Sequence, residues 1–456
     1  RQCPLGHDDL PRVLIGYTAM SDMIRSRAQA LLPELTAIRR DLHRYAEPGW
    51  LEMRTTSLLA RKLTDLGYEV LTGPAVCKAD ARMGLPSDDA LEAHYKWAQE
   101  NGADPEFLPA TRGGFTGVIA TMHCGEGPTI ALRFDIDALG VLEADDETHL
   151  PAREGFRSVT PGVMHACGHD GHAAIGIGTA MLLRELRDQL HGTVRLIFQP
   201  AEEGVRGASS IVAAGHLDDA DYALAAHVFP AGKAAGLVDV GVLAENGTGG
   251  LATSKLDVTF HGRSAHAGIA PQEGRNALLA AATAVLNLHA IPRYGNTPTQ
   301  LNVGTLHAST GRNVICETAK LELEVRGQTT EANDYMLRRA QQIVKAAAEM
   351  QDCTVELQPM GHADALRCDW PLSSRVERVC KEALGLRVTH VNALGGGSED
   401  FSCMSQRVQQ QGGQAAYVGL LCACPAANHN DHFDFDEQAL ANGAAMFTAV
   451  TASLLA

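Results

Sequence analysis

The spacing of apolar residues predicts one amphipathic helix near the start of the chain and then alternating strands and helices. From residue 23 to about residue 66, apolar side chains recur every three or four positions, which places them on one face of a helix. Because strands separated by helices are joined by crossovers, we expect a mostly parallel sheet covered on both faces. The predicted elements are strands at 115–122, 129–134, 194–198 and 222–228 and helices at 170–190 and 208–214.

A different order of elements begins near residue 249. Strands at 255–260, 300–306, 319–326 and 354–357, with helices at 276–290 and 331–350, give the order β-α-β-β-α-β, which is ferredoxin-like. After residue 361 the alternation resumes, with helices near 372–384 and 437–455 around a strand at 415–421. The fold class is therefore α/β: a mostly parallel sheet domain, 20–248 and 361–456, with an inserted ferredoxin-like α+β domain, 249–360. Residues 1–19 precede Met20 and are expected to be a leader outside the fold.

Composition supports two domains and disfavours several kinds of partner. The chain has 456 residues, 45% of them hydrophobic and 20% charged, which exceeds what one core usually organises. Its 38 Lys and Arg against 54 Asp and Glu give a formal charge of −16, which would repel nucleic acids and anionic membranes. We find no apolar run long enough for a membrane helix and no signal-peptide pattern. Eleven cysteines, an odd number, are typical of reduced thiols, and we expect a cytoplasmic protein.

Residues with metal-ligand chemistry follow the ends of the predicted strands. A loop at 164–172 contains one thiol and three imidazoles within nine positions, including Cys167 and His169. Each residue alone has an ordinary explanation as a buried thiol or a packed histidine. In an open parallel sheet, however, the carboxyl ends of the strands share one crevice. The residues that follow or end the other strands are Asp135, Asp137, Glu202, Glu203 and His227.

A divalent cation in that crevice explains the two adjacent glutamates. Glu202 and Glu203 repel each other, and without a counter-charge they would be two solvated acids. A cation held by Cys167, His169 and His227 would stabilise both anions and let one act as a ligand and the other as a base. His429, in a polar loop before the last helix, offers one more imidazole. The glycine-rich turn at 395–401 lacks the Lys-Ser/Thr of a phosphate-binding loop, so we reject a nucleotide site there.

Three sequence blocks resemble a known family. Residues 165–170 (HACGHD), 199–203 (QPAEE) and 397–401 (GSEDF) are similar to the signature blocks of aminoacylase-like dinuclear metallopeptidases, in the group of hippurate and auxin-conjugate hydrolases. Within that group, 82–86 (RMGLP), 113–117 (GGFTG) and 433–437 (FDFDE) resemble the branch that acts on p-aminobenzoyl-glutamate. The similarity extends from about Met20 to the C-terminus.

The resemblance implies a two-metal site and a lid. It implies that the inserted domain is a lid and dimerisation domain, that Glu202 is the general base, and that His266 reaches a neighbouring active site. Asp135 and Asp137 are expected to support the metal ligands. Two divalent ions per chain, Mn²⁺ or Zn²⁺, would be bound by Cys167, His169, Glu203, His227 and His429. Three residues are candidates for binding a carboxylate of the substrate: Arg312 and Arg326 through two hydrogen bonds from the guanidinium, and Asn313 through its side-chain amide.

Our first functional hypothesis is a metal-dependent amidohydrolase that cleaves the amide between an aromatic acyl group and an acidic amino acid. The best substrate prediction is p-aminobenzoyl-glutamate, and the alternative is indoleacetyl-aspartate or another N-acyl amino acid. A hypothesis of another class is a catalytically silent metal-binding subunit of a hetero-oligomeric hydrolase. We favour the active chain because Glu202 is present with every expected ligand. A homodimer through the lid is expected, and a homologous partner chain is the alternative.

Overall fold

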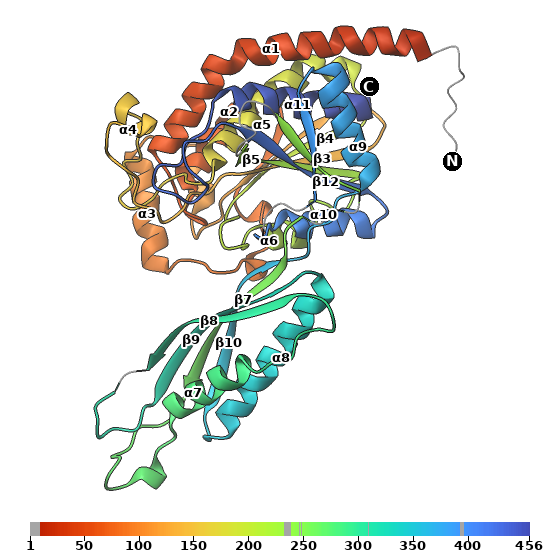
Figure 1. Cartoon of the computed structure of the whole chain (residues 1–456). Coiled ribbons are helices and arrows are strands. Elements are labelled where there is room, and N and C mark those ends of the chain that lie inside the picture. Colours follow the sequence, from red (N-terminus) through yellow and green to blue (C-terminus); the bar gives the residue numbers. More distant parts are fainter. Residues whose placement is uncertain (1–9, 232–238, 246, 248, 309, 393–395) are drawn as a thin grey trace.

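The computed structural model describes residues 10–231, 239–245, 247, 249–308, 310–392 and 396–456, and these form two bodies, each built on one sheet (Figure 1). The larger sheet has eight strands. Their order across the sheet is β1 (Glu69–Leu71), β2 (Val118–His123), β4 (Thr193–Gln199), β3 (Thr129–Asp135), β5 (Tyr222–Pro230), β12 (Gln414–Cys422), β6 (Val240–Leu243) and β11 (Val388–Val391). The four central strands, β4, β3, β5 and β12, are mutually parallel, whereas β2 joins β4 and β6 joins β12 in antiparallel pairs.

Helices cover both faces of this sheet, as the alternation of strands and helices predicted. On one face α1 (Leu10–Arg44), α5 (His169–Leu186) and α11 (Gln438–Leu455) pack together. On the other face lie α6 (Ala208–Ala213) and α10 (Phe401–Gln410). Along β3, Leu132 belongs to the first core and its neighbour Ala131 to the second, because successive side chains of a strand point to opposite faces. The remaining helices of this body are α2 (Met53–Asp65), α3 (Asp88–Glu100), α4 (Leu150–Glu154) and α9 (Trp370–Arg378).

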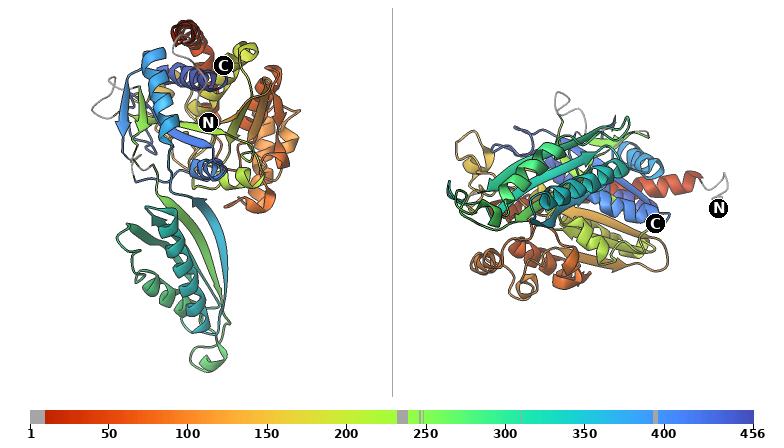
Figure 2. Two further views of the ribbon diagram at one scale, coloured as in Figure 1. Left: turned by 90° about the vertical axis from the view of Figure 1, so that its right-hand side faces the viewer. Right: turned by 90° about the horizontal axis from the view of Figure 1, so that it is seen from below.

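The smaller body is joined to the larger one by two chain connections (Figures 1 and 2). Its antiparallel sheet has the order β10 (Thr354–Ala363), β7 (Ala252–His261), β9 (Thr318–Gly327) and β8 (Thr299–Ala308). Two helices, α7 (Ala277–Leu288) and α8 (Thr330–Glu349), bury an apolar core against one face. This is the ferredoxin-like arrangement that the element order predicted. We use the name lid for this smaller body as a label only.

One expectation from the sequence was wrong in detail. The single helix expected from residue 23 to 66 is two helices, because the chain leaves the helical path between Arg44 and Met53. Pro48 disfavours a helical residue before it, and Trp50 takes a positive φ of 67°. Helix α1 begins at Leu10, inside the segment predicted to be a leader, while residues 1–9 lie outside the described part of the chain. No helix within the described residues combines the length and apolarity that crossing a membrane requires.

Candidate metal centre and active site

A cavity of about 320 Å³ lies where the carboxyl ends of the central strands meet the lid. The larger body lines it with Cys167, Glu202, Glu203, His227 and His429. Cavities of this size accept small molecules, and a parallel sheet places its ligands at this edge. The structure thus brings together residues that are up to 262 positions apart in the sequence.

Cys167, His169 and His227 form the first set of candidate metal ligands. Their ligand atoms all lie within 4.8 Å of one another, and the Cys167 Sγ is 3.3 Å from His227 Nε2. Cys167 precedes α5 and His169 begins it, with Gly168 between them at a φ of +88°. A residue with a side chain rarely adopts that backbone conformation, so the glycine allows the thiol and the imidazole to face the same point.

Cys167, Glu203 and His429 form a second set with the same thiol as a member. Their ligand atoms also lie within 4.8 Å of one another, and His429 Nε2 is 3.5 Å from Glu203 Oε1. The backbone N–H of His429 donates to the carbonyl of Ala166 at 2.7 Å, which ties the C-terminal loop to the loop of Cys167. Hydrogen bonding to Cys167 and then to Glu203 raises the pKa of His429 to about 10. Two overlapping sets that share one thiol suit two ions with a bridging ligand.

Unpaired buried atoms show that these residues fit metal ions. His169 Nε2 is buried and has no hydrogen-bond partner among the described residues, and Glu203 Oε1 is buried with the ring of His429, itself a candidate ligand, 3.5 Å away. His227 Nδ1 donates to the Val228 carbonyl at 2.7 Å, which leaves the lone pair of its Nε2 facing Cys167. Buried polar atoms ordinarily have partners. A buried acceptor that has none and lies beside a thiol is therefore what we expect where a metal ion binds. The residues present therefore fit a pair of divalent cations.

Two aspartates orient these ligands. Asp137 accepts a hydrogen bond from His169 Nδ1 at 3.1 Å and another from the Glu203 backbone N–H at 2.9 Å. Asp135 accepts from His172 Nδ1, whose Nε2 accepts from the Val228 N–H at 2.9 Å. Both ring nitrogens of His172 are thus engaged, and this imidazole supports the site from outside. A hydrogen bond to the far ring nitrogen fixes the tautomer of a metal-binding histidine.

The loop that carries Glu202 and Glu203 is held in an unusual conformation. Ala201 and Val205, on either side of it, have positive φ angles of 51° and 59°. For a β-branched residue such as Val205 this is a costly conformation, and such strain collects at functional sites. Glu52 stabilises the loop by accepting a hydrogen bond from the Ala201 N–H at 2.7 Å.

Glu202 is the candidate general base. Its carboxylate is buried, and its oxygen lies within 4.8 Å of ligand atoms of His169 and Glu203. Burial, followed by the charges of Glu399 and Glu203, raises the pKa of Glu202 well above its ordinary value. A carboxylate that is harder to ionise holds a proton more strongly, which suits a group that accepts and returns one near neutral pH.

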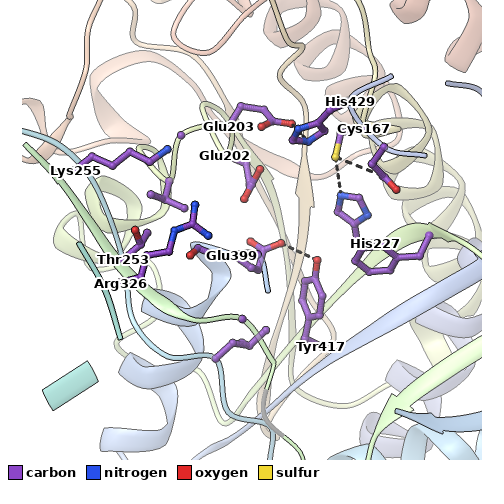
Figure 3. A pocket seen from close by; sticks show the side chains of 18 residues that line it. Cys167, Glu202, Glu203, His227, Thr253, Lys255, Arg326, Glu399, Tyr417 and His429 are labelled. Carbon is purple, nitrogen blue, oxygen red and sulfur yellow. Dashed lines mark hydrogen bonds and ion pairs between the residues drawn. The ribbon is translucent and has the colours of Figure 1, made fainter. Parts of the chain in front are cut away.

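A buried ion network lies beneath Glu202. Arg133 forms ion pairs with Asp135, with Glu399 at 2.8 Å and with Asp400 at 3.2 Å. The hydroxyl of Tyr417 donates to the other oxygen of Glu399 at 2.7 Å. One guanidinium therefore counters three acids and fixes Glu399 at the edge of the cavity, beside Glu202 (Figure 3).

The lid contributes a wall that faces the metal ligands across the cavity. Thr253 and Lys255 of β7 and Arg326 of β9 line it (Figure 3). Arg326, a predicted substrate-binding residue, is therefore at the cavity, where it is paired with Glu324 at 2.8 Å and donates to the Gly396 carbonyl at 3.1 Å.

The other predicted lid residues lie away from this cavity. His266 forms an isolated bridge with Val314, and the Ala267 N–H donates to the Asn313 carbonyl at 2.9 Å, so these residues meet at one end of the lid. The ten-residue strand β7 separates them from Thr253 by about 30 Å at roughly 3.3 Å per residue. His266, Arg312 and Asn313 are exposed, and none is among the described residues that line the cavity of their own chain.

Sequence reasoning missed several residues of the site. Asn428 Nδ2 lies 3.6 Å from the Cys167 Sγ, and it is the residue before His429. Lys255 could have been found from the alternation of polar and apolar positions along 253–260, which places it on the uncovered face of its strand. Glu52 carried no usable signal, because it lies in a segment whose pattern predicted an uninterrupted helix.

Comparison with known proteins identifies the family. Residues 131–453, more than half of the chain, match Peptidase family M20/M25/M40. The chain therefore belongs to this family. The predicted class, an aminoacylase-like metallopeptidase, and the predicted α/β fold are both confirmed, as is the prediction of an amidohydrolase.

Two curated relatives are similar over nearly their whole length. An indole-3-acetyl-aspartic acid hydrolase of Enterobacter agglomerans is 45% identical over 422 residues, 92% of this chain and 95% of that protein. One of the subunits of the p-aminobenzoyl-glutamate hydrolase of Escherichia coli (strain K12) is 44% identical over 415 residues, covering 90% and 94%.

Solved structures show the same fold. An aminobenzoyl-glutamate utilization protein from Klebsiella pneumoniae superposes with a TM-score of 0.79 and 39% identity, over 93% of this chain and 97% of that one. A dinuclear metal binding peptidase of the M20 family from Bacillus subtilis gives a TM-score of 0.63 and 26% identity, over 94% and 99%.

Proposed function

We propose that the protein uses two divalent metal ions to hydrolyse the amide bond between an aromatic acyl group and an acidic amino acid. The observation that carries the proposal is that Cys167 belongs to two sets of ligands, one with His169 and His227 and one with Glu203 and His429. Glu202 lies beside both sets. A relative that binds two metals shares the fold, which supports the same count here.

The chain's own residues account for the proton transfers of this reaction. When bound, a pair of divalent cations acidifies a water and polarises the amide carbonyl. Glu202 then takes the proton of the attacking water and returns it to the leaving nitrogen. Asp137 holds His169 and the Glu203 backbone in place during this step, and the lid wall keeps bulk water from the reacting groups.

The proposed substrate is p-aminobenzoyl-glutamate, and indoleacetyl-aspartate is the second candidate. Both are aromatic acyl groups joined to an acidic amino acid, and hydrolases named for them are 44% and 45% identical to this chain. We propose Mn²⁺ or Zn²⁺ as the metal. Thiolate and imidazole ligands suit zinc, and the availability of each metal in the cell decides which of the two is bound. The ten described cysteines are free thiols, which supports the cytoplasm as the proposed location.

We further propose that residues 249–360 form a lid and dimerisation domain and that 20–248 and 361–456 form the catalytic domain. The distance between the cavity and His266 of the same chain supports a dimer in which each lid places its His266 in the active site of the neighbouring chain. A second copy of this chain is the proposed partner. The alternative is a homologous chain, supported by the name of the Escherichia coli relative, which designates that protein as one of the subunits of its enzyme.

A substrate panel with a base variant tests this function. Purified protein loaded with Mn²⁺ or Zn²⁺ is expected to release p-aminobenzoate from p-aminobenzoyl-glutamate, and indoleacetyl-aspartate is assayed in parallel. Glu202→Gln should bind metal normally and lose roughly 100-fold or more in kcat, because general bases contribute at least that much. Hydrolysis within about threefold of wild type in this variant would show that Glu202 is not the base. No turnover of either substrate by the wild-type protein would refute the proposed function.

A further inference from the structure

The lid presents one polar sheet face to the cavity. Helices α7 and α8 cover the opposite face of the sheet, and residues of alternate positions share a face. Lys255 of β7 lies directly opposite Glu324 of β9, and Thr253 lies opposite Arg326. The cavity wall made by the lid therefore carries two cations, Lys255 and Arg326, and one acid at its edge.

The two cations differ in what they are bonded to. Arg326 is engaged by both oxygens of Glu324, at 2.8 and 3.4 Å, and by the Gly396 carbonyl. Lys255 is half-buried, and none of the hydrogen bonds or ion pairs found among the described residues involves its ammonium group. Burial lowers the pKa of Lys255. The negative charges of Glu324 and Glu202 partly oppose this effect, but no carboxylate oxygen is bonded to the ammonium group, so its three N–H donors are available to an anion that enters the cavity.

The direction of Lys255 defines what it can reach. Its side chain extends from the lid strand into the cavity, toward Glu202 and Glu203 on the other side (Figure 3). These glutamates belong to the proposed metal and proton-transfer groups, so the scissile amide lies next to them. One half of the substrate would lie between the scissile amide and the lid wall, and the acidic amino-acid half is the one whose charge is complementary to Lys255.

We propose that Lys255 binds the side-chain carboxylate of the substrate's acidic amino acid and makes the enzyme selective for N-acyl glutamate or aspartate over neutral N-acyl amino acids. This proposal rests on the proposed function. An ammonium recognises a carboxylate as a compact point charge on a flexible stem, so it tolerates side chains of either length. The α-carboxylate, which every N-acyl amino acid has, is left to Arg312 and Asn313 of a second copy.

The test compares two substrates that differ only in charge. The substrates are p-aminobenzoyl-glutamate and p-aminobenzoyl-glutamine, and the variant is Lys255→Met, which keeps an unbranched apolar stem and removes the ammonium group. We expect wild-type protein to prefer the glutamate substrate in kcat/KM. In the variant, kcat/KM for glutamate should fall roughly 10- to 100-fold, as expected for a hydrogen bond between charged groups, and kcat/KM for glutamine should change less than about threefold.

Lys320→Met is the matched control. Lys320 is an exposed lysine of β9 on the same sheet face, six positions from Arg326 and therefore about 20 Å farther along the strand. This control should leave the preference unchanged. Lys255→Gln repeats the test should the methionine variant fold poorly, and Lys255→Arg should restore part of the preference, since it retains the charge.

The outcomes separate this inference from the function beneath it. A glutamate preference that survives Lys255→Met and Lys255→Gln overturns the inference while the hydrolase function stands. An equal loss on both substrates also overturns it, because Lys255 would then contact a part that both share. Failure of the wild-type protein to cleave either substrate, with metal bound, refutes the proposed function itself.

Discussion

The backbone N–H of Glu203 donates a hydrogen bond to Asp137 at 2.9 Å. The other oxygen of the Asp137 carboxylate lies 3.1 Å from His169 Nδ1. One aspartate at the end of β3 therefore positions a ligand from each of the two candidate metal sets. Neither contact is made to the cavity itself, so Asp137 acts on metal binding through other residues.

Asp137→Ala should weaken metal binding by about 10- to 100-fold, the usual effect of losing a partner that orients a ligand. The reason is that His169 loses its fixed tautomer and the Glu203 loop loses an anchor. A calorimetric titration of the protein with the metal ion measures the affinity directly. Asp145→Ala, at an exposed position nearby in the sequence, is the control and should bind metal as the wild type does. Unchanged affinity in Asp137→Ala would contradict a supporting role.

Arg133→Met should destabilise the fold by about 3–5 kcal/mol, since it leaves three buried acids without their counter-charge. The three are Asp135, Glu399 and Asp400. The expected readout is a lower midpoint of thermal unfolding for metal-loaded protein. Arg387→Met breaks an exposed pair with Asp239 and should leave the midpoint almost unchanged. Similar midpoints for the two variants would show that the network contributes no net stability.

A buried histidine should make stability depend on pH above neutrality. His43 lies 2.8 Å from Asp170 and 2.9 Å from Glu143. Burial alone would lower its pKa, but hydrogen bonds to Asp170 and Glu143 outweigh this and raise the pKa of His43 to about 9. Burial alone would raise the pKa of Glu143, but hydrogen bonds to His149 and His43 outweigh this effect and lower the pKa to about 2.

The sign of the effect follows from these two directions. A raised pKa contributes stability that is complete below the unfolded value of about 6.5 and is lost as pH rises through about 9. A lowered carboxyl pKa contributes above the unfolded value of about 4.5 and is lost as pH falls toward 2. Glu143→Gln should therefore lower the melting temperature most between about pH 5 and 6.5, and much less at pH 9.5. If Glu143→Gln lowered the melting temperature equally at every pH, this would contradict a charged pair of Glu143 and His43. Glu147→Gln, at an exposed position, is the control.

Hybrid dimers test whether the lid serves a neighbouring chain. If each active site takes His266 from the second copy, a hybrid of Glu202→Gln with His266→Ala contains one complete site. Co-expression in equal amounts makes half of the dimers hybrids, so activity should recover to about a quarter of wild type, although each variant alone is inactive. A mixture of Glu202→Gln with Cys167→Ala, both changes in the larger body, should recover nothing. The absence of recovery in the first mixture would place His266 in the site of its own chain.

The sequence predicted the order of strands and helices well because each element has its own period of apolar residues. Strand ends in a parallel sheet meet at one edge, so Cys167, Glu203 and His227 could be assigned to one crevice without coordinates. Placing His429 there required the resemblance to a family, since nothing local in a polar loop indicates where it folds. The short strands β6 and β11 were missed, because four residues are too few to establish a period.

Other features depend on contacts that no local pattern encodes. Glu52 holds the Ala201 loop across 149 positions, and it does so because the chain breaks its helix near Pro48 and turns back. Lys255 resembles any other lysine of a half-exposed strand until the lid is placed over the metal ligands. Packing between bodies, rather than the propensity of a segment, decides such positions.

The sharing of one thiol between both ligand sets links the proposed catalyst to the redox state of its surroundings. Conversion of the Cys167 thiolate to a sulfenic acid, or its capture in a mixed disulfide, would remove a ligand from both metal positions in one chemical event. Sulfenic acids and disulfides are reversed by cellular thiols, whereas the sulfinic acid is not. Loss of activity under mild peroxide would therefore come in two stages, the first restored by a reductant together with metal and the second permanent.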